Sequence, residues 1–172
     1  MIVGFIRELV QHYNEKSYWK MRQYVQNNPR GGVRRLYYAF RVKRMDAFAN
    51  ASTGISLNGI SAHFDSPPRL PHGLYGIIIV PGAKIGKNVR ICHQVTIGND
   101  FKDITHVPTI GDNVEIYPGA KIVGKVVVGN NAVIGANAVV NKDVPPNTLV
   151  VAQPVRFVVK EIAYEKENTD NS

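Results

Sequence analysis

Aliphatic residues recur every six positions through the second half of the chain. They are Ile79, Ile85, Ile91 and Ile97, followed in a second run by Ile110, Ile116, Ile122, Val128, Ile134 and Val140. A period of six is neither the two of an ordinary strand nor the 3.6 of a helix. It is typical of a coil with three short sides, each turning one aliphatic inward before a corner, with coils stacked about 4.8 Å apart. We therefore predict a mainly β fold, a parallel β-helix of hexapeptide repeats.

The repeat fails at one place. Ile97 and Ile110 are 13 positions apart, so about seven extra residues within 99–106 must leave the coil as a loop. A long loop within a regular solenoid usually carries function, although a tolerated insertion is the alternative.

The first fifty residues follow a helical pattern. One apolar stripe comprises Ile2, Ile6, Leu9, Val10 and Tyr13, and a second comprises Val33, Leu36, Tyr37, Phe40 and Phe48. Pro29-Arg30-Gly31-Gly32 separates the two. We predict two or three short amphipathic helices whose stripes face the core. Their solvent side would carry Arg34, Arg35, Arg41, Lys43 and Arg44. The expected parts are a basic α-helical segment (1–50), the β-helix (51–160) and a polar tail (161–172).

Charge is concentrated in the same segment. The 172 residues include 21 Lys and Arg against 13 Asp and Glu, a net charge of +8, and residues 1–50 hold ten of these cations against three acids. The single Cys92 excludes an internal disulfide and takes a small-residue corner place. Because the sequence has no apolar run of about 20 residues and no signal-peptide pattern, we expect a cytoplasmic protein. The basic segment would contact the inner membrane face, an anionic acceptor or a neighbouring subunit.

Several motifs accompany the repeat: Leu70-Pro71-His72-Gly73, His93-Gln94-Val95-Thr96-Ile97-Gly98, Asn141-Lys142-Asp143-Val144-Pro145-Pro146 and Gln153-Pro154-Val155-Arg156. Together with the hexads, they resemble the left-handed β-helix acetyltransferases of the serine acetyltransferase-like branch, and most closely those that O-acetylate bacterial surface polysaccharide. The resemblance implies left-handed coils, against the usual right-handed crossover. It also implies acetyl-CoA as acetyl donor, a homotrimer with the coenzyme between subunits, and one His as general base.

The same resemblance assigns roles to individual residues. His72 would be the base, because a hydroxyl needs its proton removed as it attacks the thioester; a His at a loop end is the alternative. His93 and His106 would bind the acceptor, unless they only pack at an interface or lie in solvent. The coenzyme would contact Gly98, Pro118, Gly119, Ala120, Ala136, Lys142 and Arg156. Of these, Lys142 and Arg156 suit phosphates, while the small residues could equally be hexad corners. No metal is expected.

The chain departs from serine acetyltransferases at three positions. Pro71 replaces an Asp before the catalytic His, Ser56 or Leu57 stands where an upstream Asp is expected, and His106-Val107 replaces an Arg-His pair that holds the serine carboxylate. A buried carboxylate without a cation is costly. We therefore expect a carbohydrate acceptor from surface-polysaccharide synthesis, with serine O-acetylation for cysteine biosynthesis as the alternative. A non-catalytic β-helix whose basic arm binds nucleic acid is a remote third. Asp65 is the nearest carboxylate in sequence that could orient His72.

Overall fold

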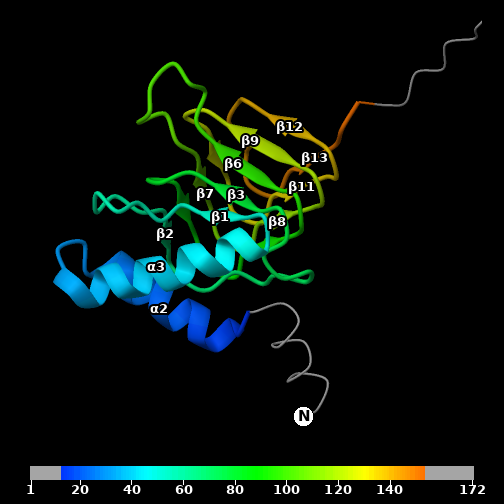
Figure 1. Ribbon diagram of the computed structural model, residues 1–172. Helices are drawn as coiled ribbons and strands as arrows, with labels where there is room; N and C mark the ends of the chain where they lie inside the picture. The colour runs from blue at the N-terminus through cyan, green and yellow to red at the C-terminus, as the bar shows by residue number, and fades with distance from the viewer. Residues whose placement is uncertain (1–12, 154–172) are drawn as a thin grey trace, which may run out of the picture.

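The computed structural model describes residues 13–153, which form a three-sided solenoid of short parallel strands with two helices at its N-terminal end (Figure 1). The first sheet contains β1 (Ser52–Thr53), β3 (Ile78–Ile79), β6 (Thr96–Gly98), β9 (Lys121–Val123) and β12 (Val139–Val140). The second contains β2 (His63–Phe64), β4 (Lys84–Ile85), β7 (Thr109–Ile110) and β10 (Val127–Val128). The third contains β5 (Arg90–Ile91), β8 (Glu115–Ile116), β11 (Val133–Ile134) and β13 (Leu149–Val150). The predicted fold class is confirmed.

The hexad aliphatics form the core of the solenoid. All ten are at most 3% exposed, and the register stacks them directly, with Ile97 opposite Ile122 and Ile122 opposite Val140. Cys92 is a buried free cysteine at a corner, as predicted. The alternation of one inward and one outward residue in each two-residue strand explains the period of six, because the remaining residues of a hexad turn the corner.

The predicted loop is confirmed by the strand register. Thr96 pairs with Lys121, 25 positions later, whereas Lys121 pairs with Val139 only 18 positions later. The seven extra residues lie between β6 and β7, and this segment projects from the solenoid in Figure 1. Pairing continues across the interruption without a slip in register, so the loop leaves the stacking of the coils unchanged.

Helix α2 (Glu15–Asn27) closes the open end of the solenoid. Its N-cap Asn14 accepts a hydrogen bond from Ser17 N at 2.8 Å, a preferred N-cap arrangement. The Gln26 side chain accepts from Phe64 N at 2.9 Å and donates to Phe64 O at 3.2 Å, as a neighbouring strand would. Trp19 packs edge-on against the Phe64 ring, with centroids 5.2 Å apart. The helix thereby covers strand edges that would otherwise be exposed at this end.

Helix α3 (Gly32–Phe48) is turned opposite to the sequence prediction. The expected apolar stripe faces outward, and its five members, Val33, Leu36, Tyr37, Phe40 and Phe48, are each more than half exposed. The buried face instead comprises Arg35, Ala39, Val42, Met45 and Asp46.

Specific polar contacts fix this orientation. Asp46 Oδ2 accepts from Thr53 N and from Thr53 Oγ1, both at 3.0 Å, and Arg35 donates to the carbonyls of Ser56 and Leu57 at 2.8 and 3.3 Å. The prediction that Arg35 lies on the solvent side is therefore wrong, whereas Arg34, Arg41, Lys43 and Arg44 are exposed as expected.

Two predictions fall outside the described residues: the first apolar stripe (2–13), of which only Tyr13 is described, and the polar tail at 161–172. The Pro29–Gly32 breaker is confirmed, since α2 ends before it and α3 begins at its last residue. Among residues 13–153, no helix is long and apolar enough to cross a membrane.

Candidate active site

Six of the predicted site residues gather along one edge of the solenoid, where the chain passes from the third sheet to the first. We call this edge the His72 corner; its successive levels are residues 71–77, 92–95, 117–120 and 135–138. Backbone hydrogen bonds connect the levels, from Gln94 N to Tyr75 O (3.0 Å), from Gly119 N to His93 O (3.1 Å) and from Asn137 N to Pro118 O (2.9 Å). His72, His93, Pro118, Gly119, Ala120 and Ala136 thus share one column.

Two imidazole rings meet at this corner. The centroids of His72 and His93 are 4.7 Å apart, with the ring planes at 86°. His72 is exposed, whereas Nδ1 of His93 is buried and has no hydrogen-bond partner among the described residues. A buried nitrogen without a partner is costly unless a ligand or another chain completes it. The arrangement therefore has one accessible base and one unsatisfied polar atom beside it.

The backbone before β3 presents His72. A turn is closed by the bond from Gly73 N to Leu70 O at 3.0 Å, and Gly73 has a φ of 67°, a conformation that glycine adopts without strain. Asp65 does not orient His72, contrary to the sequence suggestion: its Oδ1 lies 3.0 Å from Nε2 of His63 instead. Within the described part of the chain, the recorded contact of the His72 ring is with His93.

Small residues occupy several positions on the outside of this corner. Ala136 is exposed, and Pro118 and Gly119 are half-buried, while Ala120 is buried within the turn. Gly119 has a φ of 72°, a left-handed conformation that favours glycine, and a Cβ there would also displace the Asn137 side chain. Lys121 was not among the predicted site residues, but its ammonium donates to Gly119 O at 2.8 Å and to Gln94 O at 3.1 Å and so stabilises the corner. The sequence feature that could have identified Lys121 is its position directly before the inward Ile122, because this position turns its side chain outward.

The loop at 99–106 is organised by its own polar side chains. Asp100 accepts from Lys102 N at 3.1 Å and lies 3.1 Å from Nδ1 of His106, and Asp103 accepts from Thr105 N at 2.7 Å. The hydrogen bond with His106 lowers the pKa of Asp100, and the Thr105 amide lowers the pKa of Asp103. Both carboxylates are therefore ionised at neutral pH.

His106 is not brought to His72 within one chain. The loop follows β6, at the edge where the first sheet leads into the second, which is the far edge of the first sheet from the His72 corner. Gly98 and the exposed Lys142 lie on this same second edge, and Arg156 is outside the described residues. In residues 13–153, no group of three or more His, Cys, Asp or Glu could hold a metal ion.

Several known proteins are similar to this chain. The family described as "Bacterial transferase hexapeptide (six repeats)" matches residues 108–142. A serine acetyltransferase of Helicobacter pylori is 35% identical over 130 residues, which cover 74% of this chain and 73% of that protein. A serine acetyltransferase of Bacillus pumilus is 36% identical over 128 residues, covering 74% and 57%.

Solved structures give the same result. A soybean serine acetyltransferase complexed with serine aligns with a TM-score of 0.65 at 31% identity, over 82% of this chain and 56% of that one. The Neisseria gonorrhoeae serine acetyltransferase aligns with a TM-score of 0.66 at 29% identity, over 86% and 55%. This chain spans between one third and three quarters of the length of the curated relatives it matches.

The solenoid of hexapeptide repeats and the His72 corner together place the protein in the class of hexapeptide-repeat transferases built on the left-handed β-helix. More narrowly, the chain belongs to the serine acetyltransferase family, whose members are acyltransferases. These relatives do not support the closer resemblance to surface-polysaccharide acetyltransferases that the sequence motifs suggested.

Proposed function

We propose that this protein transfers the acetyl group of acetyl-CoA to a hydroxyl group, with His72 as general base and serine as the acceptor. The observation that carries the proposal is the exposed His72 ring packed against His93, at the head of a column of small residues. Membership of the serine acetyltransferase family supports both the reaction and this acceptor.

The chemistry would run by direct transfer. The acceptor hydroxyl attacks the thioester carbonyl while His72 takes its proton, and collapse of the tetrahedral adduct breaks the carbon–sulfur bond and releases CoA as thiolate. A backbone N–H near the carbonyl would stabilise the oxyanion. The proton held on His72 then passes to the thiolate, so that the products are the acetyl ester and CoA and the enzyme is regenerated.

The residues present fit the proposed donor. The pantetheine arm would lie along the short residues Pro118, Gly119 and Ala136, which are exposed or half-buried, whereas Ala120 is fully buried and presents no surface to it. Lys142 is exposed at the other edge of the first sheet, and Gly98 lies at the same edge. We propose that these residues and Arg156 complete the coenzyme site across a subunit boundary in a homotrimer, which would also bring His106 to the acceptor.

A sugar hydroxyl is the second candidate acceptor, and one observation favours it. The loop that carries His106 presents two ionised carboxylates, Asp100 and Asp103, and its His106 is bonded to Asp100. A serine carboxylate would meet negative charge there, whereas sugar hydroxyls can donate hydrogen bonds to carboxylates.

The test is release of free CoA thiol from acetyl-CoA by the purified chain, with serine and with a panel of sugars as acceptors. Rapid turnover on serine supports the main proposal, and turnover only on sugars supports the second. His72→Ala is expected to lower kcat by about 10²- to 10⁴-fold, as for a lost general base. His63→Ala is the matched control, since His63 is exposed and paired with Asp65 outside the corner. Full activity of His72→Ala would refute the assignment of the base.

A further inference from the structure

The outward face of α3 combines large apolar side chains with positive charge. Val33, Leu36, Tyr37, Phe40 and Phe48 are 85, 55, 52, 63 and 55% exposed. They recur at spacings of three, four and eight residues and so share one face of the helix. We call this set, with the cations Arg34, Arg41, Lys43 and Arg44, the outer α3 face. We propose that the outer α3 face docks on a membrane surface rich in anionic lipid.

The apolar side chains of this face are more than half exposed to solvent. Single exposed apolar residues are ordinary, but several large ones gathered on one helix face usually mark an interaction site. The polar contacts of Arg35 and Asp46 fix the opposite face of α3 against the solenoid. These contacts hold the five apolar side chains on the side of α3 that faces away from the described part of the solenoid.

The charge on the face has one sign. Arg34, Arg41, Lys43 and Arg44 are exposed, and the acid within α3, Asp46, is buried on the opposite side. An apolar helix face flanked by Lys and Arg is the pattern of helices that lie in the plane of an anionic bilayer surface. Each such cation near an anionic surface strengthens binding about fivefold.

Aromatic rings hold several of the guanidinium groups in place. Arg41 lies 5.9 Å from the centroid of Tyr37 and donates to its hydroxyl at 3.1 Å, while Arg44 lies 5.7 Å from the centroid of Phe48. Aromatic rings and guanidinium groups that lie at the same depth suit the lipid headgroup region of a membrane, where amphipathic aromatic side chains are favoured.

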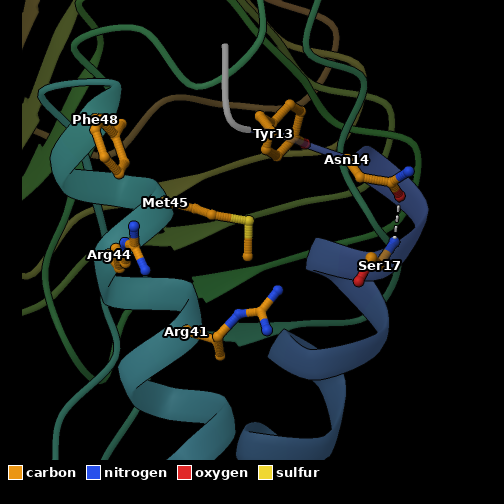
Figure 2. A pocket seen from close by; sticks show the side chains of 7 residues that line it. All are labelled: Tyr13, Asn14, Ser17, Arg41, Arg44, Met45 and Phe48. Carbon is orange, nitrogen blue, oxygen red and sulfur yellow. Dashed lines mark hydrogen bonds between the residues drawn. The ribbon is translucent and has the colours of Figure 1, made fainter. Parts of the chain in front are cut away.

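A pocket of about 370 Å³ lies at the C-terminal half of this helix, between α3 and α2 (Figure 2). Its lining residues are Tyr13, Asn14, Ser17, Arg41, Arg44, Met45 and Phe48. Among the described residues, the lining carries two guanidinium groups and no carboxylate, and Figure 2 shows the Arg41 side chain extending toward α2. A lipid phosphate fits such a lining, because guanidinium groups bind phosphate oxygens through charge-assisted hydrogen bonds. The pocket thus adds a headgroup site to the apolar face.

Charge decides between a membrane and a second copy of the chain. A symmetric pair of outer α3 faces would place two sets of four cations against each other, and like charges across an interface oppose association. An anionic bilayer instead provides negative charge for the four cations and an apolar interior for the exposed apolar side chains.

The test is co-sedimentation of the full chain with vesicles of phosphatidylcholine alone, or of phosphatidylcholine and phosphatidylglycerol in equal parts. We expect binding to the anionic vesicles, weaker binding at high salt, and little binding to phosphatidylcholine alone. Arg41→Gln with Arg44→Gln should weaken binding roughly 25-fold. Leu36→Ser with Phe40→Ser should abolish it. Both variants change exposed side chains, so their thermal unfolding and CoA release should match the unchanged protein, which separates this proposal from the enzymatic one.

Two double variants on the solenoid serve as controls. Lys87→Gln with Lys125→Gln removes two exposed charges, and Val127→Ser with Val139→Ser removes two exposed apolar side chains. Neither should reduce vesicle binding by more than about twofold. No binding to anionic vesicles, or equal losses in the control variants, would overturn the proposal. Self-association that Leu36→Ser with Phe40→Ser abolishes would also overturn it and would assign the face to a second copy of the chain. Salt-sensitive binding to duplex DNA without binding to vesicles would overturn it too and would assign the face to nucleic acid.

Discussion

At the scale of single residues, a buried polar network lies where the helices meet the solenoid. Tyr18, Arg22 and Asp46 are buried together, with the Tyr18 hydroxyl donating to Asp46 Oδ1 at 2.6 Å. The Arg22 guanidinium donates to the carbonyls of Thr53 and Ala62 and lies 4.8 Å from the Phe64 ring. Burial lowers the pKa of Arg22 to about 10 and raises the pKa of Asp46. Such a network specifies one orientation of the helices, because any other leaves charges unpaired.

Asp46 gives a pH-dependent prediction. Burial is the main reason that its pKa in the folded protein exceeds the unfolded value of about 3.9. The native state therefore holds this proton to higher pH than the unfolded state, and the stability that protonation contributes is lost as pH rises through the folded pKa. Asp46→Asn removes this term. The free energy of unfolding of the wild type minus that of Asp46→Asn should fall as pH rises above about 4.

The measurement is urea unfolding of both proteins over a series of pH values. Asp143→Asn controls for the loss of one negative charge, since Asp143 is exposed on the solenoid. A stability difference that grows with pH would contradict the predicted sign.

At the scale of elements, α2 acts as a cap whose Gln26 amide takes the place of a missing strand. Gln26→Ala leaves the Phe64 N–H and C=O without their partner. We expect a loss of about 1–3 kcal/mol in the free energy of unfolding, measured by urea denaturation.

Gln26→Glu refines this test. A carboxylate can still accept from Phe64 N, but it cannot donate to Phe64 O, so an intermediate loss is expected. Equal stability of all three proteins would show that the amide pairing contributes nothing to the cap.

The loop is the second element with a separable role. Deletion of residues 100–106 places Ile97 and Ile110 six positions apart and restores the hexad period. Because the strands on either side already pair in register, the deletion variant should fold, with a thermal midpoint within about 5 °C of the wild type. If the loop binds the acceptor, KM for the acceptor should rise while KM for acetyl-CoA changes little. Unchanged kinetics would make the loop a tolerated insertion.

For the whole molecule, stability resides in the stacked aliphatic column. Ile116 is fully buried in β8, which pairs with β5 on one side and β11 on the other. Ile116→Ala should lower the free energy of unfolding by about 2–5 kcal/mol, because it leaves a cavity inside a coil with neighbours above and below. Val139→Ala, on an outward position of the first sheet, should cost far less. Comparable losses from both would contradict a core carried by the inward hexad positions.

The sequence alone determined the solenoid. Each inward Ile or Val, each corner and the length of the loop follow from a period of six, because a local pattern repeated coil after coil leaves one way to stack. It also indicated which residues form the corner around His72, since a repeat converts spacing along the chain into position in space.

Only the tertiary structure decided which face of α3 is buried. The apolar stripe of Val33, Leu36, Tyr37, Phe40 and Phe48 predicted burial, but the contacts of Arg35 and Asp46 turned it outward. Hydropathy weighs each residue by itself, whereas a buried carboxylate depends on partners such as Tyr18 and Thr53 that lie far away in sequence. For the same reason, only the structure placed His93 against His72 and paired Asp65 with His63: a side-chain contact depends on where the backbone brings two residues, which their order along the chain does not state.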